Sequence, residues 1–166
     1  APIFASRWLI WRISKFNEQN PTISIRVDPR TELIDMNNTE VDVGIRVGKN
    51  LRHDPTAIKL LKQRVFPVCS PELAKRIETP ADLLNLPIIR ENDDLYGWDV
   101  WLEESDIHNP VFRAGPTYGD ASLCLDAAMS GQGVFMAWET LACDALERGQ
   151  IISPFHLRSE TGAAYW

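Results

Sequence analysis

The side chains that most often carry out chemistry in proteins are few in this sequence, and they are scattered. The three histidines, His53, His108 and His156, stand far apart, and none is one helical turn from another metal-binding residue type. This spacing disfavours a metal site and favours loop or surface positions for the histidines. We therefore predict no bound metal and no other cofactor.

Three serines near predicted helix starts are potential nucleophiles: Ser6, Ser70 and Ser122. No Gly-x-Ser-x-Gly motif surrounds any of them, and helix capping is the ordinary use of serine at such positions. Gly131-Gln-Gly133 is not a dinucleotide fingerprint, because it joins a helix to a strand in the reverse of the required order. Without a paired acid and base, the sequence predicts that the chain is not an enzyme.

Three predicted helix N-termini are better candidates for a binding site. They lie near Phe4-Ala-Ser6, near Ser70-Pro71 and at Asp120-Ala-Ser122. A helix N-terminus offers unpaired amides and about half a positive charge, which suits a carboxylate or another small anion. Each one alone is more often a capped helix and nothing else, so only their combination favours a ligand site.

The segment from Tyr118 to Phe155 indicates the architecture that positions these residues. Asp120 is a good N-cap for an apolar helix that stops at Gly131. A short apolar strand follows over 133–137, then a second helix over 138–148 that ends at Gly149, then a strand at 151–152. A buried strand between two helices implies an α/β sheet covered on both faces.

Elsewhere the pattern alternates between strands and helices in the βαβ manner. An amphipathic helix is predicted over 5–19, although Ile10 and Trp11 lie off its apolar stripe. The other predicted elements are strands at 22–27, 40–48, 57–68 and 87–90, a helix starting at Ser70-Pro71, short helices at 33–38 and 79–84, a loop at 91–97 and a terminal strand from 163.

Composition excludes several classes of protein. The 166 residues carry a formal net charge of −6, which argues against a nucleic-acid surface within the chain. No apolar run approaches the roughly 20 residues that a membrane span needs, and no signal peptide is visible. The three cysteines are an odd number without a Cys-x-x-Cys motif, which favours reduced, buried thiols and a cytoplasmic protein.

The order of motifs resembles the effector-binding domain of bacterial LysR-type transcriptional regulators, most closely the subgroup around the glycine-cleavage-system activator. The resemblance rests on the opening Pro2–Leu9 segment, Val41-Asp-Val-Gly-Ile-Arg-Val-Gly48, Pro67-Val-Cys-Ser-Pro-Glu-Leu73, the Asp120…Gly131-Gln-Gly-Val134 helix and Tyr165-Trp166. It implies two α/β lobes of the type II periplasmic-binding-protein kind, joined by two crossover strands, with an effector in the cleft between them. DNA would be bound only through an N-terminal helix-turn-helix that is absent from this sequence.

On the family pattern, lobe I comprises residues 1–66 and 154–166, and lobe II comprises residues 67–153. The first strand and last helix of the usual domain are missing on this pattern, so we expect a domain truncated at both ends. The expected effector-binding residues are Phe4, Ser6, Arg46, Val47, Ser70, Gly119, Asp120, Trp138 and Phe155. Arg46 pairs either an anionic ligand or a carboxylate between the lobes.

The resemblance also implies a homodimer, in which the first helix of one subunit packs against the helix near Ala121 of the other. Ile10 and Trp11 are the expected interface residues, because they lie off the helix's own stripe. Trp11 stands where the subgroup often has proline. The alternative is that a further helix of the same chain covers Trp11.

We expect the effector to be an amino acid or a small carboxylate rather than a phosphate, since the carboxylate of Asp120 offsets part of the helix field. The alternative function is a solute-binding protein that delivers such a ligand to a transporter, which would have the same fold. An enzyme on this fold is a weaker, third alternative.

Overall fold

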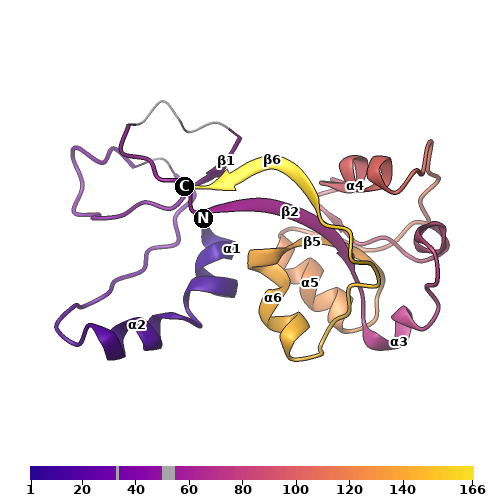
Figure 1. The fold of residues 1–166 in the computed structure, drawn as a ribbon, viewed down its shortest axis with the longest axis horizontal. Coiled ribbons are helices and arrows are strands. Elements are labelled where there is room, and N and C mark those ends of the chain that lie inside the picture. Colours follow the sequence, from indigo (N-terminus) through magenta and orange to yellow (C-terminus); the bar gives the residue numbers. More distant parts are fainter. Residues whose placement is uncertain (33, 50–54) are drawn as a thin grey trace. The chain divides into compact units, whose positions relative to one another are not determined.

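The computed structural model describes residues 1–32, 34–49 and 55–166. Leu33, the first residue of one predicted helix, and His53 lie outside the described residues. The chain divides into two compact units, Ala1–Gln63 with Gly162–Trp166, and Arg64–Thr161. Strands β2 (Leu61–Val68) and β6 (Ser159–Tyr165) each run from one unit into the other (Figure 1). The first boundary lies near the predicted one, at residue 63 rather than 66, whereas the second lies further along the chain, at residue 161 rather than 153. The assignment of these units as regulatory lobes I and II stays a prediction.

The first unit opens with a helical segment whose turns are not uniform. Helix α1 (Pro2–Phe4) continues into the π-helical turn η1 (Ala5–Leu9), where the N–H of Ile10 donates to the carbonyl of Ala5 at 3.0 Å. Helix α2 (Ile13–Gln19) follows only after a break at Arg12, whose φ is −111°. The prediction of one continuous helix over 5–19 was therefore wrong, because the wider π turn changes the phase of the side chains.

The predicted strands at 22–27 and 40–48 are largely absent. Residues 22–27 have no strand partner, and Ile23, Ile25 and Val27 stay 38–49% exposed. Only β1 (Val47–Gly48) pairs, antiparallel to β6 through Val47 and Tyr165. A period-two pattern sets where side chains point, but a strand also needs a neighbour for its backbone groups. The βαβ alternation predicted for the whole chain thus fails in this unit.

The predicted helix at 33–38 is also wrong for the residues described. The Asp35 carboxylate accepts hydrogen bonds from the backbone N–H of Asn37 at 3.0 Å and from the side-chain amide of Asn38 at 2.9 Å. These bonds lower the pKa of Asp35. Short polar side chains that bond to neighbouring backbone amides favour turns over helices, and a turn is what forms here.

The second unit follows the predicted pattern closely. Its elements after β2 are α3 (Pro71–Ala74), the 3-10 helix η2 (Pro80–Asn85), β3 (Arg90–Glu91), α4 (Trp98–Glu104), β4 (Thr117–Tyr118), α5 (Ala121–Met129), β5 (Phe135–Trp138) and α6 (Glu139–Glu147). Helices α5 and α6 pack against β5 and against each other (Figure 1). The fully buried side chains include Trp98, Trp101, Ile88 and Met136, so this unit has its own core.

The helix caps and glycine stops predicted from the sequence are present in this unit. Asp120 caps α5 by accepting from the N–H of Leu123 at 3.0 Å, and Ser70 caps α3 by accepting from Leu73 at 3.3 Å. Gly131 and Gly149 follow α5 and α6 with φ of +84° and +68°, values that suit glycine. The predicted strand at 151–152 is reduced to one bridge between Cys69 and Ile152.

The prediction of buried cysteines is confirmed for two of the three. Cys69 and Cys124 are buried, whereas Cys143 is half-buried. Burial raises the pKa of Cys69 to about 11, so this thiol stays protonated near neutral pH. Among the described residues, no helix is both long and apolar enough to span a bilayer.

Candidate functional site

Three parallel strand segments of the second unit end at the same edge of a sheet. Residues 87–91 lie in the middle, bridged in parallel to Arg113 through Pro87 and to Val134 through Ile88. Strand β3 then pairs in parallel with β4, and the N–H of Asn92 donates to Tyr118 at 2.9 Å. The chain leaves this edge at Asn92, Gly119 and Trp138. Ligands of open α/β sheets bind at such carboxyl ends.

The N-terminus of α5 meets this edge, and two carboxylates of the protein occupy it. Asp120 accepts from Leu123, and Glu91 accepts from the backbone N–H of Ala121. Burial raises the pKa of Glu91, and the negative charges of Asp120 and Asp94 raise it further. The positive end of the helix is thus already used by the protein, so this edge is acidic rather than an anion site.

A small pocket opens beside these groups, entirely within the second unit. Its apolar walls are Ile89, Trp98, Phe135 and Met136, and its other lining residues are Glu91, Asp94, Tyr96 and Trp138. The rings of Tyr96 and Trp138 meet edge to face, with centroids 6.2 Å apart. Aromatic walls with a few polar groups are typical of ligand pockets.

Of the site residues predicted in the second unit, the structure brings three to this edge. Gly119 and Asp120 follow β4 directly, and Trp138 ends β5. The carbonyl of Gly119 accepts from the side-chain amide of Asn92 at 3.1 Å, which ties two of the strand ends together. Phe155 instead packs on Trp101 of α4, with ring centroids 5.6 Å apart.

Ser70 lies at the opposite edge, which corrects the expectation that it shares a site with Asp120. Strand β2 runs antiparallel to β5, pairing Val68 with Phe135 at the amino end of β5. A Cβ at Gly131, just past the end of α5, would lie 3.5 Å from the Ser70 hydroxyl oxygen. Since α5 has nine residues, about 13 Å of helix separates Ser70 from Asp120.

The residues predicted in the first unit are only partly brought together. Phe4 is buried, with its ring centroid 4.9 Å from that of Trp8 and 5.1 Å from that of Tyr165. Val47 pairs with the same Tyr165 in β6. Ser6 is not at a helix start, because the helical segment begins at Pro2, and its hydroxyl donates to the carbonyl of Ile3 at 3.4 Å.

Arg46 has a structural role that neither sequence alternative foresaw. Its guanidinium donates to the carbonyl of Thr31 at 3.2 Å and also to the carbonyl of Glu32. Its backbone forms a reciprocal pair with Trp166, at 3.1 and 2.8 Å. The side chain thus fixes the irregular segment near residue 31 within its own unit.

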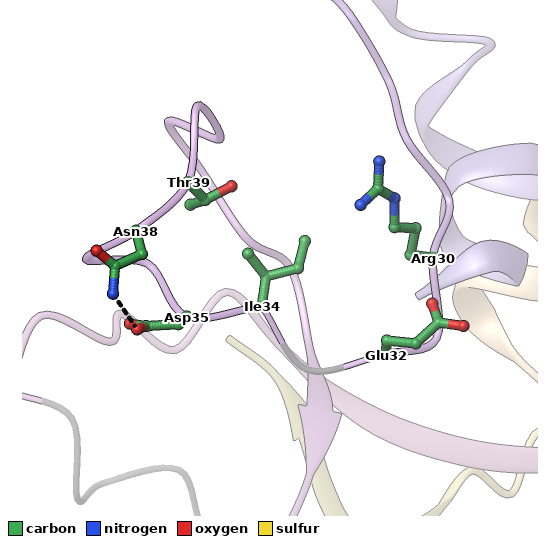
Figure 2. Close-up of a pocket in the computed structure, with 6 residues that line it drawn as sticks. All are labelled: Arg30, Glu32, Ile34, Asp35, Asn38 and Thr39. Atoms are coloured by element: carbon green, nitrogen blue, oxygen red, sulfur yellow. Dashed lines mark hydrogen bonds between the residues drawn. The ribbon is translucent and has the colours of Figure 1, made fainter.

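The larger pocket in the described chain, of about 650 Å³, lies in the first unit and is lined by Arg30, Glu32, Ile34, Asp35, Asn38 and Thr39. Figure 2 shows that its walls come from one irregular segment, with the Asn38 amide bonded to Asp35 rather than directed at a ligand. No buried polar atom without a partner lines it. Size alone would favour this pocket, but the strand ends and their chemistry favour the smaller one.

Sequence reasoning missed Glu91, Asp94 and Tyr96, which it assigned to a polar loop. The loop prediction is confirmed from Asn92 onward, since Asn92 and Asp93 adopt left-handed backbone angles, with φ of 47° and 65°. Glu91 instead ends strand β3. The signal that would have found these residues is their place directly after a predicted strand at 87–90, where ligands of parallel sheets bind.

A family model described as the LysR substrate binding domain matches residues 1–165. The chain belongs to this family. The HTH-type transcriptional regulator PerR of Escherichia coli K12 is 31% identical over 154 residues, which are 93% of this chain and 52% of PerR. The glycine cleavage system transcriptional activator of the same strain is 30% identical over 158 residues, again 93% of this chain and 52% of the relative. The chain therefore spans about half the length of these relatives.

Solved structures agree with the family assignment. The effector binding domain of AmpR from Citrobacter freundii superposes with a TM-score of 0.78 at 27% identity, covering 98% of this chain and 82% of that one. The effector domain of Pseudomonas aeruginosa AmpR gives a TM-score of 0.75 at 25% identity, covering 99% and 79%. The predicted fold, the mixed α/β arrangement of LysR substrate-binding domains, is confirmed.

Proposed function

We propose that this chain is the effector-sensing and dimerisation domain of a cytoplasmic, DNA-binding transcription regulator. The family and the names of its relatives support the regulatory role. DNA binding would belong to a part of the regulator outside these residues, because the chain itself carries a net charge of −6. Nothing in the comparisons supports the alternative of a solute-binding protein.

We further propose that a small effector contacts the carboxyl edge of the second unit, at Glu91, Gly119, Asp120 and Trp138. The observation that carries this proposal is the convergence of three parallel strand ends on a pocket with aromatic and charged walls.

A thermal-shift screen of amino acids, carboxylates and aromatic acids tests the sensing role. A ligand that binds only the folded state, at about 100 times its Kd, adds roughly 2.7 kcal/mol of stability. For a chain of this size, we expect Tm to rise by several degrees. If no small molecule of any class raises Tm, the sensing role is wrong.

Two variants test where the ligand binds. Gly119→Phe puts a large ring at the carboxyl edge and should abolish the shift, because the nearest atom to a Cβ there is 4.0 Å away and the fold should tolerate the change. Ser70→Ala changes the opposite edge and should keep the shift. A shift that survives Gly119→Phe, with circular dichroism unchanged, would place the ligand elsewhere.

A further inference from the structure

The pocket at the carboxyl edge carries negative charge that no cation of the protein neutralises among the described residues. Glu91 and Asp94 both line it, and Asp120 is close enough to act on Glu91. The neighbouring carboxylate Glu139 differs, because it forms an ion pair with Arg64. An acidic pocket without a counter-charge has the electrostatics of a cation site.

One buried polar atom in the described residues lacks a hydrogen-bond partner, and it belongs to a side chain that lines this pocket. It is Nε1 of Trp138, a side chain that is only 7% exposed and that lines the pocket with Glu91. Leaving a buried donor unpaired destabilises the folded state, so native proteins seldom retain one without a reason. An oxygen acceptor on a ligand would satisfy this N–H.

The dimensions and lining residues of the pocket restrict the kind of cation that it can hold. Its space of about 10 Å³ is close to that of one water molecule, so it admits a single small group and not a whole ligand. Among the described residues, no group of three or more His, Cys, Asp or Glu side chains is arranged to hold a metal ion. The rings of Tyr96 and Trp138 offer faces and edges to an organic cation.

We propose that this pocket receives the ammonium group of a small amine with an oxygen acceptor, of the α-amino acid type, using Glu91 and Asp94 as counter-charges. The indole N–H of Trp138 donates to the acceptor oxygen of the same molecule. This inference rests on the proposed effector-sensing function and specifies the chemistry of its ligand.

Matched ligands test the ammonium requirement. Calorimetry with the purified protein would compare alanine and phenylalanine with propionate and 3-phenylpropionate, which lack only the amine, across a wider set of such pairs. We expect an amino acid to bind at least tenfold more tightly than its deaminated partner. If the deaminated acids bind equally well, or if they bind and no amino acid does, the ammonium assignment is wrong while effector sensing stands. If neither series binds and the wider thermal-shift screen is also negative, both proposals fail.

Two substitutions separate the two contacts. Glu91→Gln keeps an acceptor for the Ala121 N–H but removes the charge. It should weaken the binding of amino acids and of simple amines by at least tenfold. Trp138→Phe removes the N–H. It should weaken the binding of amino acids and leave the binding of ethylamine and phenethylamine unchanged. Glu103→Gln, at an exposed position of α4, is the matched control and should bind as the parent does. Unaltered amino-acid affinity in a folded Glu91→Gln variant would mean that the pocket holds only a water molecule.

Discussion

At the scale of single residues, Glu91 is a side chain whose ionised form destabilises the folded protein. It is half-buried at a strand end, and two further carboxylates act on it. Desolvation and like charge both disfavour its ionised form, and the one hydrogen bond from Ala121 opposes them. The folded protein therefore holds this proton more tightly than the unfolded chain does.

Glu91→Gln should make the protein relatively more stable as the pH rises. Because the pKa of Glu91 is raised above its ordinary value of 4.5, its unfavourable contribution is absent at lower pH and develops as the pH rises through the folded pKa. Urea unfolding from pH 4 to pH 7 would measure the difference between parent and variant. The Glu103→Gln control should show no such trend, and a variant that loses stability towards neutral pH would contradict this account.

At the scale of elements, two backbone segments approach so closely that only glycine fits between them. A Cβ at Gly133 would lie 2.3 Å from the carbonyl oxygen of Pro87, a contact that real structures do not contain. This approach allows residues 87–91 to bridge to Val134 and holds the strand ends at the candidate site in register.

Gly133→Ala should destabilise the second unit by roughly 2–3 kcal/mol, because the added methyl group must push two strands apart. Urea unfolding measures the loss, and the matched control is Gly119→Ala, where the nearest atom would be 4.0 Å from the new Cβ. Equal stability of the two variants would show that the strands separate without cost.

The same scale shows what the sequence could and could not predict. Helices α5 and α6 were predictable because local chemistry sets their ends: Asp120 caps α5, and Gly131 and Gly149 stop the two helices with positive φ. The segments 22–27 and 40–48 were not, because strand formation depends on a partner that no local pattern reveals. Gly119, Asp120 and Trp138 lie at one edge, and their role in binding stays a prediction. The position of Ser70 required knowing that β2 runs antiparallel to β5.

At the scale of the whole molecule, the family relationship leads us to propose a homodimer through the first helical segment. Ile10 and Trp11 are 54% and 56% exposed in the single chain. Both residues lie in the turn between η1 and α2. Exposed apolar side chains grouped together are typical of partner surfaces.

Trp11→Glu should shift the protein towards monomer in sedimentation experiments without unfolding it, since a buried charge at a dimer interface is costly. Val111→Glu changes an apolar residue that is 83% exposed in the second unit, and should leave the oligomeric state unchanged. A Trp11→Glu variant that unfolds, or that stays as dimeric as the parent, would remove Trp11 from the interface.

The crowded carboxylates around Glu91 also imply that the binding of any cation beside them would be an exchange reaction. Asp120 and Asp94 raise the proton affinity of Glu91, and the thiol of Cys124, with its pKa raised to about 12, stays neutral beside them. A cation bound there would supply the positive charge that a proton otherwise supplies, so its arrival would release that proton to solvent over the pH range in which Glu91 titrates. Occupancy by such a cation would then rise with pH in that range, and it would depend on the ratio of cation to hydrogen ion.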